Sequence, residues 1–265
     1  HETPGIIGDV VNIWKAPIVD EHTGDVARFL DHLGRLLPDH RDRKIMLTYM
    51  QSLVQNPGIK FQWAPVIQGV EGNGKTFLVR CLAHAVGEGM SYSPKASQLT
   101  EKFNSWLEHK LFIGVEEIKI PDHRREMMED LKDWITNDRV EIRHVGGTKT
   151  MSENFANWLL TTNHQDAVPI TKNQRRYAML FTAQQDADDL VRDSMNGQYF
   201  TSLYRWFNVE GGKQAISYFL RHHPIDPEFD PAGGCERAPI TAATPIAIGA
   251  SLGRVEQEIL EAVEE

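Results

Sequence analysis

The residues best suited to chemistry lie at positions 69–76, where the chain reads Gly-Val-Glu-Gly-Asn-Gly-Lys-Thr. This order fits the phosphate-binding pattern G-x-x-x-x-G-K-[ST]. In such a loop the glycines let backbone N–H groups face a triphosphate, the lysine reaches the β and γ phosphates, and the threonine hydroxyl can ligate Mg²⁺. A chance glycine-rich turn is the alternative. We expect ATP to be held by Gly69, Gly72, Asn73, Gly74, Lys75 and Thr76, with Thr76 also serving Mg²⁺.

The stretches on both sides of this loop have the patterns that a phosphate-binding loop requires. Residues 63–68 read as a short buried strand, and residues 77–86 read as a helix with apolar residues at helical spacing. A helix that starts directly after the loop adds the partial positive charge of its N-terminus to the site. The flanks therefore favour a nucleotide-binding protein over a chance turn.

Two further apolar runs end in polar residues that suit nucleotide hydrolysis. Residues 111–115 are followed by Glu116, which would help to hold Mg²⁺, and Glu117, which would orient the attacking water. Residues 158–162 are followed by Asn163, whose amide could contact the γ-phosphate. Open α/β sheets bind ligands at the carboxyl ends of their strands, so these side chains should lie near the loop. Solvated acids and a turn-forming asparagine remain the alternatives.

Two basic segments complete the set of candidate residues. Residues 140–150 read as strand, glycine turn and strand, and they carry Arg143, His144 and Lys149. Arg175 and Arg176 precede another apolar run. Taken alone, these segments could be a solvated hairpin with incidental charges and a structural arginine pair.

In their order, these five motifs resemble superfamily 3 helicases, in particular the helicase module of phage and plasmid primase-helicase proteins. The resemblance extends from a helical entry at residues 47–58 to the Gly-Gly pair at 211–212. It implies ATP hydrolysis with Lys75, Glu116, Glu117 and Asn163 at the site. In that family an arginine immediately before a hydrophobic strand reaches the neighbouring subunit's γ-phosphate, which favours Arg176, with Arg175 as the second choice.

The same resemblance implies that the hairpin grips single-stranded DNA in the channel of a ring, with Arg143, His144 and Lys149 on the phosphates. The family often has a Lys-His or Lys-x-Lys tip, whereas this chain has Val-Gly-Gly-Thr-Lys at 145–149, so the contacting residue is left open. A formal net charge of −9 argues against general attraction to nucleic acid, and any DNA contact must be local.

Composition bounds the remaining possibilities. With 265 residues, of which 41% are apolar, the chain can bury a substantial core. No apolar run approaches the roughly 18 residues of a membrane span, so no membrane partner is expected. Two cysteines make neither a disulfide framework nor a zinc site, which indicates an intracellular compartment. The chain begins at His1, and we expect a longer polypeptide with a primase upstream.

Alternating short apolar strands and helices predict an α/β fold. We expect an AAA+-like P-loop NTPase parallel sheet with flanking helices, a small N-terminal helical lobe and C-terminal helices. The lobe, with an extended and irregular entry, would occupy residues 1–60, the ATPase core 61–183, and a helical region with a Pro/Gly linker and a Glu-rich tail 184–265. Helices outside the core are expected at 25–37, 41–54, 186–195, 199–207 and 211–220.

Taken together, the motifs and the resemblance predict an ATP-dependent DNA helicase that uses Mg²⁺ and forms a homo-oligomeric ring, with a hexamer expected. The resemblance implies 3′-to-5′ movement during replication of a phage or mobile element, in the cytoplasm of a bacterial host. One alternative is an ATP-dependent DNA-binding initiator or switch that assembles without processive unwinding. A small-molecule kinase is a third possibility, which the paired acids and paired arginines disfavour.

Overall fold

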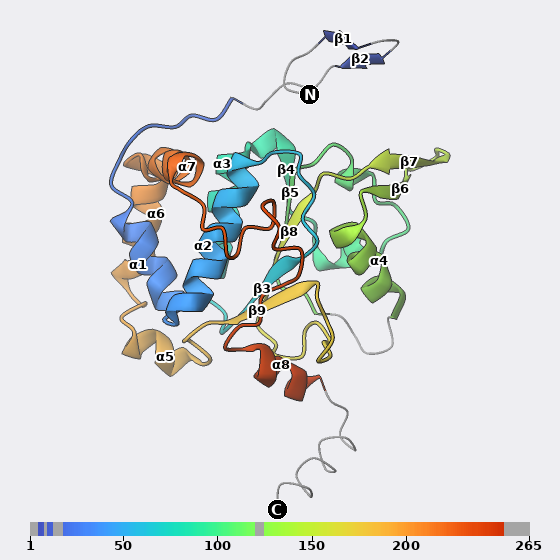
Figure 1. Cartoon of the computed structure of the whole chain (residues 1–265). Helices are drawn as coiled ribbons and strands as arrows, with labels where there is room; N and C mark the ends of the chain where they lie inside the picture. The colour runs from blue at the N-terminus through green and yellow to red at the C-terminus, as the bar shows by residue number, and fades with distance from the viewer. Residues whose placement is uncertain (1–4, 8–9, 13–17, 120–124, 252–265) are drawn as a thin grey trace, which may run out of the picture.

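The computed structural model describes residues 5–7, 10–12, 18–119 and 125–251 (Figure 1). Its centre is a five-stranded sheet in the order β4-β5-β8-β3-β9, and every neighbouring pair runs parallel. The strands are β4 (Ser91–Tyr92), β5 (Phe112–Val115), β8 (Asn157–Thr162), β3 (Ala64–Gln68) and β9 (Tyr177–Phe181). The predicted α/β fold with a parallel sheet and flanking helices is therefore confirmed.

The central strands are apolar on both faces because a hydrophobic core lies on each side of the sheet. Along β3, Ile67 belongs to one core and Val66 to the other, as the side-chain alternation of a strand requires. Neighbouring strands divide in the same way, with Leu159 in the first core and Leu160 in the second. Continuous apolar runs are typical of strands buried on both faces.

Helices cover both faces of the sheet (Figure 1). The first core gathers the N-terminal and C-terminal helices around α3, and the second gathers α4 and α8. The helices are α1 (Ala27–Leu36), α2 (His40–Gln55), α3 (Lys75–Val86), α4 (Arg125–Thr136), α5 (Ala187–Arg192), α6 (Gln198–Val209), α7 (Gly212–His222) and α8 (Thr244–Ala250). Three short 3-10 turns, at Glu88–Met90, Ala96–Thr100 and Ser105–Leu107, complete the connections.

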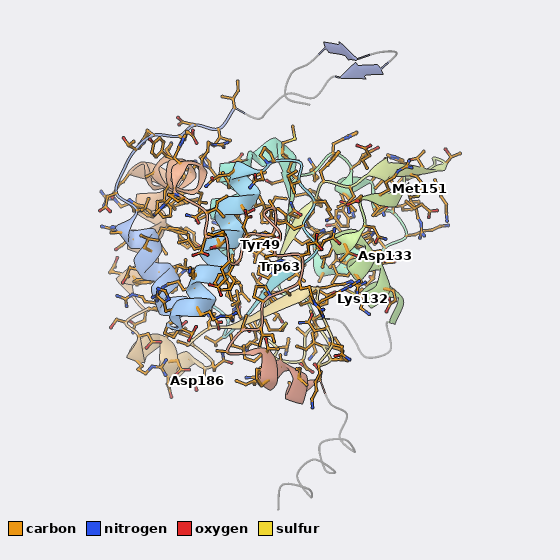
Figure 2. All side chains as sticks on the ribbon, viewed as in Figure 1. Tyr49, Trp63, Lys132, Asp133, Met151 and Asp186 are labelled. Carbon is orange, nitrogen blue, oxygen red and sulfur yellow. The ribbon has the colours of Figure 1, made fainter. Side chains whose placement is uncertain are left out.

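Helices α2 and α7 both contact α3, so the N-terminal and C-terminal helices share one core with the helix that follows the 69–74 loop. Tyr49 of α2 lies beside Trp63, just before β3, with ring centroids 5.0 Å apart (Figure 2). The Tyr49 hydroxyl donates to the carbonyl of Trp158 at 2.7 Å, which joins this helix to β8. The N-terminal helices therefore pack directly against the sheet.

In the described ranges, two antiparallel hairpins lie outside the central sheet. Strands β6 (Arg139–Arg143) and β7 (Lys149–Glu153) form the predicted hairpin, which projects from the body beside α4 (Figure 1). Strands β1 (Gly5–Ile7) and β2 (Val10–Asn12) pair near the N-terminus, where the sequence predicted an irregular segment. That prediction gave too much weight to proline and glycine and too little to the β-branched residues, which favour strands.

The five helices that the sequence predicted outside the core are present with shifted ends, whereas α8 was not predicted. The largest difference is α5, whose helix is shorter than the predicted 186–195. The predicted Glu-rich tail falls in residues 252–265, outside the described part of the chain. No helix in the described ranges is long and apolar enough to cross a membrane.

Lys60 joins α4 to the start of β8 on the amino-terminal side of the sheet. Its ammonium group donates to the carbonyl of Trp134 at 2.9 Å and also to the carbonyl of Ala156. Asn154 donates to the same Trp134 carbonyl at 2.8 Å. Loss of hydration lowers the pKa of Lys60 to about 7.

The first prediction concerns this lysine. Because its folded pKa lies below the ordinary value of 10.5, the unfolded chain binds more protons between pH 7 and about 10. Stability should therefore rise with pH in this window, by up to about 1.4 kcal/mol per pH unit from this group. Lys60→Met should flatten the rise. Urea unfolding of both proteins from pH 6.5 to 8.5 measures the difference, and parallel curves would contradict the prediction.

Candidate functional site

The loop of residues 69–74 connects β3 to α3 at the carboxyl edge of the sheet, and its shape depends on glycine. Gly72 and Gly74 adopt φ of +81° and +88°, in the left-handed region that favours glycine. A Cβ on Gly74 would lie 2.6 Å from Cε1 of His32. A Cβ on Gly69 would lie 1.9 Å from Oγ1 of Thr182. The three glycines therefore allow a tight turn that packs against both the N-terminal helices and β9.

Lys75, the first residue of α3, lies at the centre of the site. Its Nζ donates to the carbonyls of Gly69 and Val70, each at 2.7 Å. It also donates to Oδ1 of Asn73 at 3.2 Å and to Oδ1 of Asn163 at 3.1 Å. One ammonium group thus links the loop to the residue that follows β8, as the sequence predicted from strand ends.

Burial and nearby acids have opposite effects on the pKa of Lys75. Burial lowers its pKa to about 8, while Glu117 and Glu71 act in the opposite direction. The side chain is therefore mostly protonated at neutral pH, which suits a group that would contact phosphate oxygens.

Glu116 and Glu117 follow β5, two strands away from β3 in the sheet. Oγ1 of Thr76 donates to Oε2 of Glu116 at 2.9 Å, so these two predicted Mg²⁺ residues lie in direct contact. Glu117 adopts φ of +55°, a conformation that costs a non-glycine residue roughly 1–2 kcal/mol. Such strain gathers at functional sites.

The oxygen atoms of Thr76 and Glu116 are the hard ligands that Mg²⁺ prefers, and Mg²⁺ usually keeps several waters beside one or two protein ligands. Their chemistry therefore fits the predicted cation. Among the described residues, no group of three or more His, Cys, Asp or Glu side chains is arranged to hold a metal ion. A dedicated all-protein metal cage is thus absent from that part of the chain.

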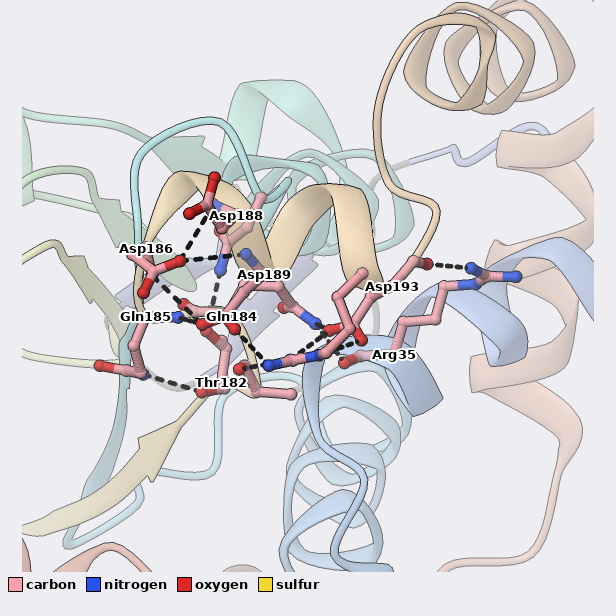
Figure 3. Close-up of polar contacts among 11 residues, drawn as sticks. Arg35, Thr182, Gln184, Gln185, Asp186, Asp188, Asp189 and Asp193 are labelled. Atoms are coloured by element: carbon pink, nitrogen blue, oxygen red, sulfur yellow. Dashed lines mark hydrogen bonds and ion pairs between the residues drawn. The ribbon is translucent and has the colours of Figure 1, made fainter.

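Sequence reasoning missed a polar network behind the loop. Nδ2 of Asn73 donates to Oγ1 of Thr182 at 2.9 Å, and the backbone N–H of Val70 donates to the carbonyl of Gln184 at 2.9 Å. Figure 3 shows how this network continues from Gln184 to Asp193 and Arg35, with Nε2 of Gln184 donating to Oδ2 of Asp193 at 2.6 Å. The end of β9 therefore fixes the loop from one side.

His32 of α1 fixes the loop from another side and was also missed. Its Nε2 lies 3.2 Å from the carbonyl of Gly74, and its Nδ1 lies 2.9 Å from the hydroxyl of Tyr199 on α6. A carbonyl only accepts, so Nε2 carries the proton and the Tyr199 hydroxyl donates to Nδ1. Burial lowers the pKa of His32 to about 4, so the ring is neutral.

Arg175 and Arg176 lie at the opposite edge of the sheet from the loop. They precede β9, and the carbonyl of Arg176 accepts from the backbone N–H of Ala64, the first residue of β3. The loop follows Gln68, at the far end of β3. Five strand residues span roughly 13–17 Å. The structure therefore does not bring either arginine to the loop of its own chain.

The hairpin residues also lie away from Lys75. Arg143 and Lys149 face each other across β6 and β7, and both form ion pairs with Glu141, at 2.7 and 3.0 Å. Nε2 of His144 lies 3.5 Å from a carboxylate oxygen of Glu108. The candidate residues thus form three separate groups: the loop and strand ends, the arginine pair, and the hairpin.

Comparisons with known proteins agree with this fold. Residues 67–176, from the end of β3 to Arg176, match a family described as "Family of unknown function (DUF5906)". The chain is 27% identical over 117 residues to the DNA Primase-polymerase of Nitratiruptor phage NrS-1. That alignment covers 43% of this chain and 16% of the phage protein.

Solved structures of the NrS-1 C-terminal region share the fold. The apo structure of residues 305–718 of that protein matches with a TM-score of 0.74 and 18% identity, over 95% of this chain and 58% of the other. The A form apo structure of the same region matches with a TM-score of 0.72, 18% identity and the same coverage. The chain therefore spans about a sixth of the curated relative and somewhat more than half of the solved region. Its fold is that of the C-terminal region of a phage primase-polymerase.

Proposed function

We propose that this chain is an ATP-hydrolysing DNA helicase module of the superfamily 3 type that acts in replication of a phage or mobile element. The observation that carries the proposal is the meeting of Lys75, Thr76, Glu116 and Asn163 at the carboxyl edge of a parallel sheet. Ligands bind at this edge in open α/β sheets. The similarity to a phage primase-polymerase supports a role in phage DNA replication.

In this proposal the loop amides and Lys75 bind the β and γ phosphates of ATP. Before ATP binds, the Lys75 ammonium is satisfied by carbonyl and amide oxygens, and phosphate oxygens would replace some of them. Glu117 orients and polarises the attacking water, and Asn163 positions the γ-phosphate. Thr76 and Glu116 would hold Mg²⁺, which neutralises charge on the transferred phosphoryl group.

The position of Arg176 supports action between subunits. The arginine lies at the edge of the sheet away from its own loop, so it could contribute only to a site on a neighbouring copy. Its Nε is buried without a hydrogen-bond partner among the described residues. A ring oligomer, which we propose to be a hexamer, would bring this guanidinium to the next ATP.

The projecting hairpin supplies the proposed contact with single-stranded DNA. Arg143, His144 and Lys149 lie near its tip, on a chain whose formal net charge is −9. Repetition around a ring would concentrate these few cations in one channel. We further propose that a primase is linked to this module and that the protein works in the cytoplasm of a bacterial host.

DNA-stimulated ATP turnover with strand displacement is the experiment that tests this function. Purified protein is mixed with Mg²⁺, ATP and a forked DNA duplex, and both phosphate release and single-strand product are followed. The proposal expects both signals. ATP-dependent assembly on DNA without turnover would instead identify an initiator or switch.

The second prediction is that Lys75→Ala abolishes ATP hydrolysis. The substitution removes the main side-chain counter-charge for the β and γ phosphates, and we expect turnover to fall by about 10²- to 10³-fold or more. Nucleotide affinity should fall as well. A steady-state phosphate-release assay checks this outcome, with Lys172→Ala, at an exposed position in the loop before β9, as a matched loss of charge. Unchanged turnover in the Lys75 variant would refute the phosphate-loop assignment.

The third prediction separates the two acids that follow β5. Glu117→Gln should retain Mg·ATP binding but slow hydrolysis by about 10²-fold or more, because the amide cannot polarise water. Glu116→Gln should weaken Mg²⁺-dependent nucleotide binding more, since this side chain contacts Thr76. Calorimetric titration and phosphate release on both variants give the ranking. The reverse ranking would exchange the two roles.

The fourth prediction concerns Arg176. Arg176→Ala should block hydrolysis without loss of nucleotide binding, because the group acts on a neighbouring site. Mixing Arg176→Ala subunits with Lys75→Ala subunits should restore some activity, at interfaces where an intact loop meets an intact arginine. If co-assembled mixtures recover nothing, the arginine does not act between subunits.

A further inference from the structure

The outward face of the β6–β7 hairpin carries an acid between its cations. Val140 and Ile142 are buried in the second core, so the alternate residues of β6 face away from the body. In the strand register, Arg143 faces Lys149 and Glu141 faces Met151. Glu141 is thus the residue next to the basic pair on the same face.

A single carboxylate oxygen of Glu141 serves both cations. Its Oε1 lies 2.7 Å from Nε of Arg143 and 3.0 Å from Nζ of Lys149. Hydrogen bonds from Arg143 and then Lys149 hold the pKa of Glu141 below its usual range. The acid is therefore ionised at neutral pH, and two cations share one counter-charge.

The hairpin turn itself adds no charge to this group. Residues 145–148 read Val-Gly-Gly-Thr, and Val145 is 77% exposed. The cations next to Glu141 on this face are therefore Arg143 and Lys149, while Arg139 lies at the other end of β6, opposite Glu153 in the strand register. A phosphate oxygen that accepts from Nε of Arg143 and from Nζ of Lys149 together would take the position that Oε1 of Glu141 holds in the free protein.

We propose that Glu141 is an internal competitor for DNA phosphate, which sets how tightly and at what salt concentration the hairpin binds single strands. This inference rests on the proposed function of the hairpin as the DNA contact. Between cycles of ATP hydrolysis, the Glu141 carboxylate occupies the phosphate position on the two cations. It leaves these cations when DNA binds. A weakened grip on each nucleotide would let the hairpin release one phosphate before it binds the next.

A structural role for the same ion pairs gives a different expectation. The three side chains are each more than a third exposed, and exposed ion pairs contribute little to folding stability. Removing the Glu141 charge should therefore leave the thermal unfolding midpoint almost unchanged. A purely structural brace would lose stability and would not gain DNA affinity.

The test compares Glu141→Gln with Glu153→Gln. Glu153 lies on the same face of β7, is exposed, and has no ion pair with the described residues, roughly 13 Å along the strand from Lys149. Both variants remove one negative charge from the hairpin, so the control accounts for net charge. The probe is a fluorescent oligothymidylate, and its anisotropy is measured with the full chain, Mg²⁺ and a non-hydrolysable ATP analogue.

We expect Glu141→Gln to bind the probe about three- to tenfold more tightly than wild type, while Glu153→Gln changes affinity by less than about twofold. The salt dependence should steepen by about one ion per bound hairpin only in Glu141→Gln, because phosphate then displaces solution anions instead of a carboxylate. Equal gains in the two variants, or no gain in Glu141→Gln, would overturn the proposal.

Lys149→Ala distinguishes the failure of this inference from failure of the proposed function. If Lys149→Ala weakens binding but Glu141→Gln does not strengthen it, the hairpin remains the DNA contact and the competitor role fails. If a variant that combines Lys149→Ala with Arg143→Ala and His144→Ala binds the probe as wild type does, the hairpin is not the DNA contact, and the competitor role fails with it.

Discussion

The hydrogen bonds of the Lys75 ammonium group are the interactions on which the rest of the site depends. This group binds two loop carbonyls and the amide oxygen of Asn163 together, so the loop after β3 and the end of β8 form one unit. This contact exists only because β8 lies directly beside β3 in the sheet. The strand order thus determines which polar residues can meet. Thr76 and Glu116 complete this set of polar residues, because β5 lies next to β8 in the sheet.

The loop is also held from outside the sheet. Thr182, which follows β9, accepts a hydrogen bond from Asn73. His32 of α1 contacts the carbonyl of Gly74 through one ring nitrogen and the hydroxyl of Tyr199 on α6 through the other. Movement of the N-terminal or C-terminal helices would therefore shift the loop backbone through these hydrogen bonds. This arrangement gives a physical route by which nucleotide at the loop could be linked to contacts made elsewhere on the molecule.

Sequence patterns predicted the sheet, its helices and the strand-end residues because each of these features leaves a pattern among residues that are neighbours in the sequence. Apolar runs mark β5 and β8, and polar residues that follow them must lie at one edge of a parallel sheet. His32 and Gln184 carry no such signal, since each acts through contacts across 42 or more residues. Thr182 does carry the signal, as a polar residue directly after β9, and could have been noticed. The pairing of Glu141 with both hairpin cations depended on strand register, which the glycine turn left open.

Separation of the three groups of candidate residues is a further result that the sequence could not give. The arginines and the loop lie at opposite ends of β3 and β9, although both are close to these strands. In a single chain this separation would leave Arg176 far from any bound phosphate. In the ring that we propose, it would leave each proposed ATP site dependent on its neighbour.

The most direct measurement of the central claim is an experimental structure of the chain with Mg²⁺ and a non-hydrolysable ATP analogue. We expect the β and γ phosphates to lie within hydrogen-bond distance of the backbone N–H groups of residues 72–76 and of Lys75 Nζ. Mg²⁺ should lie beside Thr76 and Glu116. A nucleotide bound elsewhere, or a loop still closed by the Lys75 contacts at saturating analogue, would contradict this claim.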